Sequence, residues 1–282
     1  MIFELMQEPQ LTYVLVLMAT GVLVGMACGL LGVGGAFIMV PIQLWALTSM
    51  GIDATIATRV AFGTGLAVIL PTSISGCYGH SCRGVVLWKP GVIMGLSGLA
   101  GAFIGGSIAA HAPAAVLKTI FGAAVLAGGF RMLLAERIRP GPKPKANPLY
   151  YVLWGFPVGI VSGLSGIGGG VLMVPVLVVA MGFSMLQAVG TSTVAIALNS
   201  IGGISSYAIN GMGVPGRPDY SLGYIDLLQF ILLAGTSVPA AQLGVRFAHF
   251  IPGRQLRYIF MALMFYIGLR MIGVFAWLGL PI

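Results

Sequence analysis

A seventeen-residue stretch occurs twice in the chain, as GMACGLLGVGGAFIMVP at residues 25–41 and as GIVSGLSGIGGGVLMVP at residues 159–175. Nine of the seventeen positions are identical, and they include a glycine cluster and a closing proline. Similarity of a chain to itself at a fixed spacing is the signature of a duplicated architecture. The stretch therefore predicts two homologous halves.

Further matches follow each copy in the same order. Gly63-Thr64 is echoed by Gly190-Thr191, and His111 by His249. We expect a first transmembrane repeat over residues 1–135 and a second over 149–282. The segment between them, 136–148, is rich in proline and basic residues. Such a segment neither continues a helix nor lies in lipid, so it is the expected linker.

The composition excludes a soluble protein. Of the 282 residues 58% are hydrophobic and only 7% are charged, against roughly 25% charged in an ordinary soluble domain. Two runs, 11–52 and 148–216, contain no charged residue. A membrane-crossing helix needs about 20 apolar residues. The chain is therefore expected to be an all-α polytopic membrane protein with about 8 to 10 transmembrane segments.

The apolar pattern predicts five helical segments in each half. They are expected at residues 11–31, 36–50, 56–78, 90–110 and 114–135, and at 149–165, 170–183, 187–210, 223–247 and 255–279. Because five is odd, the second half is inverted relative to the first if every segment crosses. The second segment of each half is short for a crossing, so the helices are candidates for being broken at the glycine clusters.

The basic residues agree with an inverted pair. Cytoplasmic loops of membrane proteins carry an excess of Lys and Arg. With the linker 136–148 in the cytoplasm, ten of the fourteen basic residues lie on that side: Arg83, Lys89, Arg131, Arg137, Arg139, Lys143, Lys145, Arg246, Arg254 and Arg257. Arg59 stands out among those that do not.

The two glycine clusters are the first candidate for a site. Glycine lets the backbone turn sharply, and the N–H groups at a helix start favour an anion. Paired clusters in an inverted repeat predict a central anion site formed by Gly34, Gly35, Gly168 and Gly169. The alternative is that these glycines only permit close helix packing. Nucleotide binding is disfavoured, because Phe37 stands where a dinucleotide fingerprint needs its third glycine.

Four polar residues of the third segments are the next candidates. Thr64 lies in the first half, and Thr191, Ser192 and Asn199 lie in the second. Their hydroxyl and amide groups are suited to bind sulfur or carboxylate oxygens in a dry pocket. The alternative for the hydroxyls is a bond back to a carbonyl one turn earlier in the same helix.

Arg59 and His80 complete the predicted substrate-binding residues. A charge such as Arg59 inside a membrane segment must snorkel, pair or line a wet cavity. It is expected to attract an anion at the outer mouth, or to pair with Asp53. His80 is expected to donate to the substrate or to cap a helix end. A catalytic pair of His80 with Cys77 or Cys82 is disfavoured because no orienting carboxylate or amide is evident. No metal or cofactor is predicted.

These motifs resemble those of the TauE/SafE family of sulfite exporters, also called the 4-toluenesulfonate uptake permease family. The resemblance spans nearly the whole chain and rests on three stretches: GLLGVGG from Gly29, GTGLAVILPTS from Gly63, and GLSGIGGG from Gly163. Gly65 departs from the serine that often follows Gly-Thr in members. The resemblance implies a bacterial inner-membrane protein that moves sulfite, small organosulfonates or other small organic anions.

The expected function is therefore transport of a small sulfur-containing or organic anion, most simply its export. Only six acidic residues occur in the chain, which disfavours a carboxylate-driven proton symporter. Proton-coupled uptake of the same anions, a channel and a membrane-embedded enzyme remain as alternatives. The expected partners are the small anion and the lipid bilayer, and no nucleic acid is expected.

Overall fold

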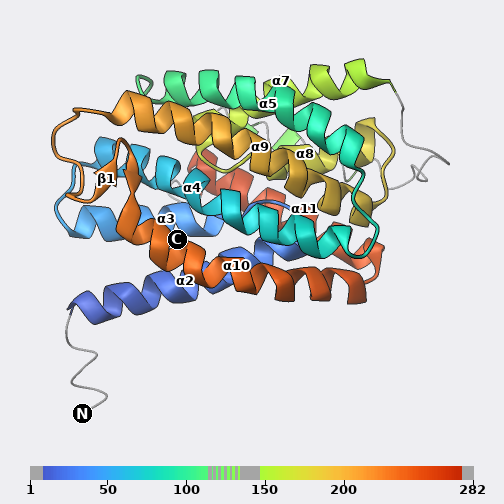
Figure 1. Cartoon of the computed structure of the whole chain (residues 1–282), viewed down its shortest axis with the longest axis horizontal. Helices are drawn as coiled ribbons and strands as arrows, with labels where there is room; N and C mark the ends of the chain where they lie inside the picture. Colours follow the sequence, from blue (N-terminus) through green and yellow to red (C-terminus); the bar gives the residue numbers. More distant parts are fainter. Residues whose placement is uncertain are drawn as a thin grey trace, which may run out of the picture.

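The computed structural model is a bundle of helices that run roughly along its long axis (Figure 1). It describes residues 9–113 and 147–274, together with scattered residues between 116 and 133. The expected fifth segment of the first half, 114–135, and the linker 136–148 therefore lie almost entirely outside the described residues.

Within residues 9–113, the first half contributes four helices. They are α2 (Pro9–Leu31), α3 (Ala36–Ser49), α4 (Ala54–Ser81) and α5 (Trp88–Ala109). Each agrees with an expected segment to within about three residues, because glycine and polar caps bound the apolar runs. Asp53, for example, accepts the N–H groups of Thr55 and Ile56 at the start of α4, as a helix N-cap does.

The second half repeats this order with a change in its second segment. It contains α7 (Pro148–Ser165), α8 (Gly170–Pro175), the π-helix η2 (Val176–Ala180), α9 (Met185–Gly211), α10 (Leu227–Phe250) and α11 (Gly253–Ile272). The expected helix over 223–247 was placed too early. A short antiparallel hairpin, β1 (Ser221–Leu222) with β2 (Ile225–Asp226), precedes α10, and Asp226 caps that helix.

Six of the described helices are long and apolar enough to cross a membrane: α2, α4, α5, α7, α9 and α10. The 14 residues of α3 extend only about 21 Å at the ~1.5 Å rise of an α-helix, less than the roughly 30 Å of a bilayer's hydrocarbon core. The 11-residue stretch Gly170–Ala180 is shorter still. The expected 8 to 10 crossings stay a prediction.

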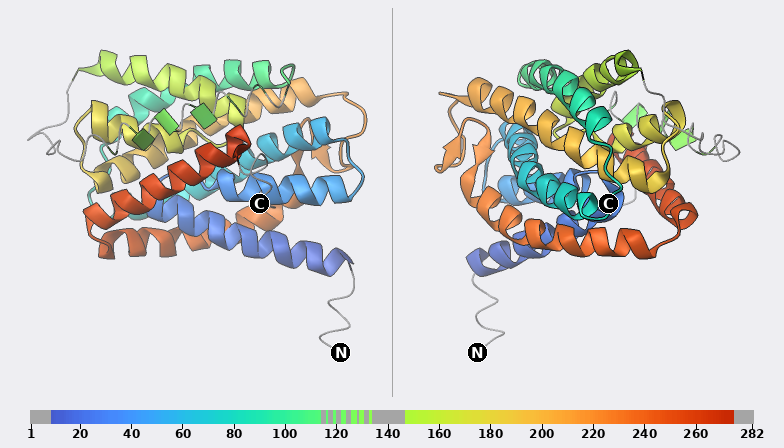
Figure 2. Two further views of the ribbon diagram at one scale, coloured as in Figure 1. Left: turned by 180° about the vertical axis from the view of Figure 1, so that it is seen from behind. Right: turned by 45° about the vertical axis from the view of Figure 1, so that its right-hand side comes forward.

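The two halves are interlocked rather than laid side by side. Helices α4 and α9 pack together near the middle of the bundle (Figure 2). The fourth helix of each half crosses over: α5 packs on α7 and α9, whereas α10 packs on α2 and α4. Each half therefore completes the helix packing of the other.

Matched glycines make these cross-half contacts close. A Cβ atom added at Gly29 would overlap the Ala241 carbonyl oxygen of α10, and one added at the matched Gly163 would overlap the Ala102 carbonyl oxygen of α5. Close backbone approach at small residues is how helices associate in lipid. Gly29 and Gly163, which lie within helices, therefore serve close packing between the halves.

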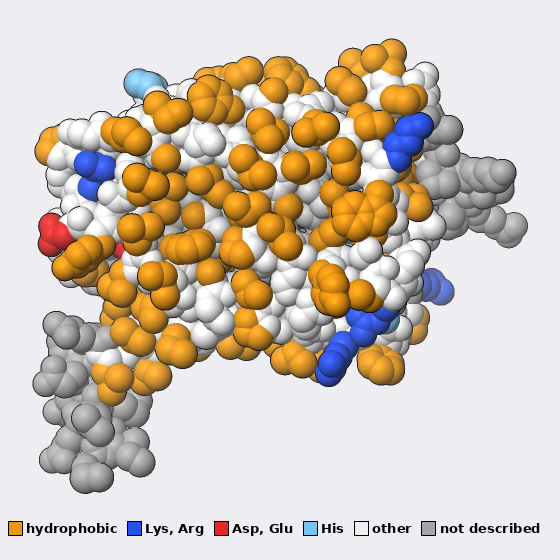
Figure 3. Space-filling view, in the orientation of Figure 1, with side chains coloured by type: hydrophobic (Ala, Val, Ile, Leu, Met, Phe, Trp, Pro, Cys, Tyr) orange, Lys and Arg blue, Asp and Glu red, His pale blue; other side chains and the backbone are white. Residues whose placement is uncertain are grey.

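The surface separates into an apolar girdle and two polar ends (Figure 3). Hydrophobic side chains cover the middle of the face shown, and blue side chains gather mainly at its right-hand end. In Figure 1 α4 ends and α5 begins at that same end, which therefore carries Arg83 and Lys89. We call it the basic end, and the end with β1 and β2 the hairpin end. Such a girdle is suited to a lipid bilayer.

Candidate functional site

The two glycine clusters come together in the centre of the molecule. A Cβ atom at Gly170 would lie 2.6 Å from Cα of Val33, and one at Gly34 would lie 3.4 Å from the carbonyl oxygen of Ile167. Ile69 of α4 touches both clusters, since it lies 3.2 Å from the positions of such atoms at Gly34 and Gly168. Stretches 134 positions apart in sequence thus form one structural unit.

The clusters also share their backbone geometry. The matched glycines Gly34 and Gly168 have φ of 82° and 76°, and Gly35 and Gly169 have φ of 76° and 77°. Only glycine adopts this left-handed region without strain. Gly35 and Gly169 are the N-caps of α3 and α8, and neither offers a side-chain cap. Two helices therefore begin at the centre with first-turn N–H groups that no cap side chain accepts.

Thr64 and Thr191 make matched bonds between the halves. Thr64 Oγ1 accepts the backbone N–H of Asp226 at 2.8 Å, and Thr191 Oγ1 accepts that of Leu87 at 3.0 Å. Asp226 and Leu87 are the N-caps of α10 and α5. Each threonine thus holds the start of the other half's fourth helix. Each threonine hydroxyl accepts one hydrogen bond here and also has a hydrogen that it can donate.

Ser192 and Asn199 bond to nearby backbone. Ser192 Oγ lies 3.0 Å from the Gly32 carbonyl oxygen and 2.8 Å from that of Val189, and so ties α9 to the first glycine cluster. With its nitrogen facing α5, the Asn199 amide donates to the carbonyl oxygens of Ala195 and Gly95 at 3.1 and 3.2 Å. Both side chains are wholly buried.

Arg59 lies near the hairpin end and contacts an aromatic side chain. Its Nη1 donates to the Tyr224 hydroxyl at 3.3 Å, and its guanidinium carbon lies 5.9 Å from the centroid of that ring, within the range of a cation–π contact. The alternative partner Asp53 instead accepts the N–H groups of its own helix. These bonds hold the pKa of Asp53 below its ordinary value, whereas burial raises the pKa of Asp226.

His80 is wholly buried and joins three helices. Its Nε2 lies 2.9 Å from the Gly29 carbonyl oxygen of α2, and its Nδ1 lies 3.3 Å from Nε2 of His249 on α10. The expected bond to a helix end is therefore present, and the partner of the ring is a second histidine rather than Cys77. Across the described residues, no group of three or more His, Cys, Asp and Glu is placed to hold a metal ion.

The structure also reveals a buried amide that the sequence reasoning missed. Gln43 on α3 is wholly buried, and neither its Nε2 nor its Oε1 has a hydrogen-bond partner within the described part of the chain. Unpaired buried polar groups are rare and costly. The signal available in the sequence was a lone glutamine in the apolar segment 36–50.

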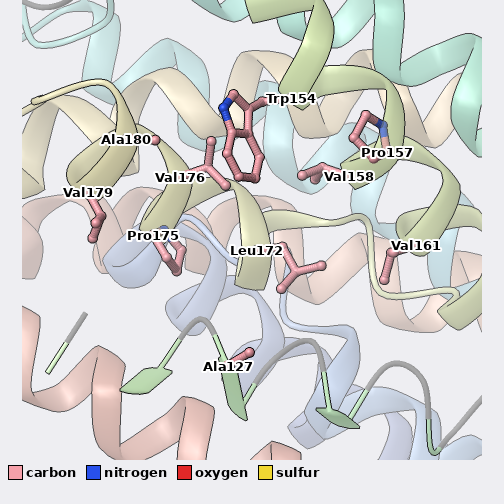
Figure 4. Close-up of a pocket in the computed structure, with 10 residues that line it drawn as sticks. All are labelled: Ala127, Trp154, Pro157, Val158, Val161, Leu172, Pro175, Val176, Val179 and Ala180. Carbon is pink, nitrogen blue, oxygen red and sulfur yellow. The ribbon is translucent and has the colours of Figure 1, made fainter. Parts of the chain in front are cut away.

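A pocket of about 300 Å³ lies beside the second glycine cluster (Figure 4), since its lining residue Val158 would lie 3.4 Å from a Cβ atom at Gly169. It is lined by apolar groups of α7, α8 and η2, among them Trp154, Leu172 and Val176. None of the predicted substrate-binding residues lines it. The glycine clusters, by contrast, are closed over by Ile69 and Ile196. The central residues thus form a packed junction rather than an open pocket in this conformation.

Comparison with known proteins agrees with this architecture. The family model "Sulfite exporter TauE/SafE" matches residues 17–271. A "Probable membrane transporter protein" of Haemophilus influenzae is 30% identical over 83% of this chain and 88% of its own length. One of Methanocaldococcus jannaschii is 29% identical over 91% and 94%, and one of Bacillus subtilis is 28% identical over 70% and 78%.

No solved structure matches the chain significantly. The family match covers most of the chain, including both glycine clusters and both sets of cross-half contacts. The chain therefore belongs to the sulfite exporter TauE/SafE family of membrane transporters.

Proposed function

We propose that this transporter exports a small sulfur-containing anion, such as sulfite or a small organosulfonate, across the bacterial inner membrane. The observation that carries the proposal is the meeting of the two glycine clusters where α4 and α9 pack together. In this proposal the anion binds between the starts of α3 and α8 during transport.

The chemistry at the junction suits an anion. First-turn N–H groups and the positive ends of helix dipoles favour negative charge. Gly34, Gly35, Gly168 and Gly169 would present their backbone without a side chain in the way. Four polar side chains lie on the two helices that flank the junction, Thr64 on α4 and Thr191, Ser192 and Asn199 on α9. The unpaired amide of Gln43, two turns into α3, adds a buried donor and acceptor.

The arrangement of the halves supports an alternating-access mechanism. In Figure 1 α2 begins at the hairpin end, whereas α7, its counterpart, begins at the basic end. An inverted repeat has this opposition, and transporters built on inverted repeats expose a central site to each side in turn. In the proposed orientation the basic end and the linker 136–148 face the cytoplasm, and Arg59 attracts the anion at the outer mouth.

The direction of transport follows from the electrical driving force. An inside-negative potential moves an anion outward by about 2.3 kcal/mol per charge per 100 mV. The described acidic residues, Asp53, Asp219 and Asp226, precede α4 or lie beside the hairpin, outside the six candidate spans. A carboxylate-driven symport thus has no acidic carrier among the described transmembrane residues, which supports export. The histidine pair favours a second candidate, a transport cycle in which a proton takes part.

The proposal is tested with the variants Gly34→Ala and Gly168→Ala. The matched control is Gly51→Ala, because Gly51 has φ of 83° but nothing within 4 Å of an added Cβ atom. All three substitutions impose the strain of a left-handed alanine, roughly 1–2 kcal/mol. Binding of sulfite, thiosulfate, methanesulfonate and acetate is measured on the purified protein, and flux in proteoliposomes at imposed potentials.

We expect wild type and Gly51→Ala to bind a sulfur anion and to move divalent sulfite faster when the potential drives it, because that anion carries net negative charge even together with one proton. Gly34→Ala and Gly168→Ala should lose affinity. Unchanged affinity in both cluster variants would place the site elsewhere. Flux that does not saturate would indicate a channel, and conversion of the anion to a product that His80→Gln abolishes would indicate an enzyme.

A further inference from the structure

The histidine pair has a defined arrangement of protons. A backbone carbonyl oxygen only accepts hydrogen bonds, so the 2.9 Å contact with Gly29 requires a hydrogen on Nε2 of His80. In the neutral ring Nδ1 of His80 is then an acceptor. The 3.3 Å contact therefore has Nε2–H of His249 as its donor. The neutral pair keeps both bonds with one hydrogen on each ring.

The pair leads from the protein's edge toward the central junction. His249 is half-buried near the end of α10, whereas His80 is wholly buried. Gly29, which accepts from His80, precedes the first glycine cluster by three residues. A proton that enters at His249 therefore has a continuous hydrogen-bonded route to the α2 backbone beside the candidate site.

Among the described residues, the surroundings of the pair supply positive but no negative charge. Arg83, in the segment after α4, acts electrostatically on both rings. The described groups that contact His80 or its neighbour Gly79 from other elements are Gly29 of α2, Gly190 of α9 and Gln242 of α10. The exposed Arg246, also on α10 and three residues before His249, adds a second positive charge at this end. The described carboxylates lie at or before the helix starts of the hairpin end. A proton on the pair is thus opposed by Arg83, and its natural counter-charge is an anion.

The matched position at the hairpin end shows that a histidine is not needed for the bond itself. Tyr207 stands sixteen residues after Thr191, as His80 stands sixteen after Thr64. The Tyr207 hydroxyl donates to the Gly163 carbonyl oxygen at 2.9 Å, and Gly163 is the repeat partner of Gly29. At the basic end the matched bond is instead made by an imidazole, whose second ring nitrogen can take up a proton.

We propose that His80 and His249 form a shared-proton site that takes up one proton when the anion binds and releases it when the anion leaves. The incoming proton binds Nδ1 of His249. Transfer of the hydrogen on Nε2 of His249 to Nδ1 of His80 then moves the charge inward, and both hydrogen bonds persist. Because binding linkage is reciprocal, the bound anion raises the affinity of the histidine pair for a proton. The bound proton in turn raises the affinity of the protein for the anion.

This inference rests on the proposed function, and its test separates the two. The variants are His80→Gln and His249→Gln, since an amide keeps a donor and an acceptor but carries no proton charge. The matched control is His111→Gln. His111, the repeat partner of His249, is exposed and bonds to the Ser107 carbonyl oxygen. The probe is methanesulfonate, which stays ionised throughout the working pH range.

Purified protein is assayed for methanesulfonate binding, and proteoliposomes with an internal pH dye report proton movement when methanesulfonate is added outside. We expect wild type and His111→Gln to acidify the interior together with methanesulfonate entry. In His249→Gln and His80→Gln this acidification should fall to the level of empty vesicles, and methanesulfonate binding should no longer strengthen as the pH falls. If the substitution at the buried His80 prevents folding, His249→Gln alone tests the inference.

Two results overturn the inference alone: methanesulfonate flux without proton movement in wild type, or unchanged acidification in His249→Gln. Loss of acidification in His111→Gln would equally contradict it, because that side chain lies outside the pair. Failure of wild type to bind methanesulfonate and sulfite would instead contradict the proposed function, and the shared-proton site with it.

Discussion

The basic end and the hairpin end of the molecule share a scaffold but differ in their charged groups. Gly29 and Gly163 are repeat partners, yet an imidazole of a histidine pair bonds to the first and a tyrosine hydroxyl to the second. The helices α4 and α10, which start at the hairpin end, are capped by the carboxylates of Asp53 and Asp226. Their counterparts α9 and α5, which start at the basic end, have the uncharged N-caps Ser184 and Leu87.

The difference separates the contacts that hold the repeated scaffold together from the groups that carry charge. Close glycine contacts and threonine bonds occur in both halves because they hold the interlocked helices together. The titratable and charged residues differ between the ends and are therefore not part of the shared scaffold. Three sets of variants test how far the ends are alike.

The largest effect is expected from closing the cross-half helix contacts. Gly29→Ala and Gly163→Ala each place a Cβ atom on a carbonyl oxygen of the facing helix. Overpacking costs typically ~1–3 kcal/mol and occasionally more, and the atoms met here are backbone atoms that cannot rotate away. Both variants should therefore unfold at a lower temperature in detergent. The control is Gly235→Ala on α10, where nothing lies within 4 Å of the added atom. If Gly163→Ala were as stable as Gly235→Ala, the close glycine contact would not stabilise both halves alike.

A smaller and again equal loss is expected at the matched threonines. Thr64→Val leaves the buried N–H of Asp226 without its acceptor, and Thr191→Val does the same to Leu87. An unsatisfied buried group costs about 1–3 kcal/mol. Hydrogen exchange of these two amides should accelerate alongside the loss of thermal stability.

The control is Thr20→Val, because the Thr20 hydroxyl bonds only within its own helix, to the Val16 carbonyl oxygen at 2.6 Å. If one threonine variant matches this control and the other does not, the two ends are held together differently.

The smallest effect is expected at the carboxylate caps of the hairpin end. Burial raises the pKa of Asp226, so its charge lowers stability as the pH rises above an ordinary aspartate pKa of about 4. The raised stability of Asp226→Asn, which keeps the cap acceptor, should therefore appear at neutral pH and vanish in acid.

Asp53 is the matched opposite case. Its pKa is lowered, so its ionised form contributes stability above the ordinary pKa that is lost as the pH falls. Asp53→Asn should thus lower the unfolding temperature at neutral pH and have no effect in acid. Shifts of the same sign in the two variants would contradict the assignment of burial to Asp226 and of hydrogen bonding to Asp53.

Much of the architecture could be predicted from local pattern. The apolar runs between caps and glycines locate α2 to α5 and α7 to α10, because helix boundaries depend on neighbouring residues. The hairpin before α10 was missed, since Ser221 to Asp226 carry only a weak pairing signal around Gly223. The glycines that meet at the junction were named in advance, but the buried Gln43 and the cross-half bonds of Thr64 and Thr191 were not.

By itself the sequence determined the membrane class, the duplication and the glycine turns, because composition, spacing and the φ of glycine are local properties. Only the tertiary structure decided which helices exchange partners, that the two clusters touch, and that His80 meets His249 and not Cys77. Those contacts join residues more than fifty positions apart in the sequence, and they depend on how closely backbones approach when the helices of one half pack into the other.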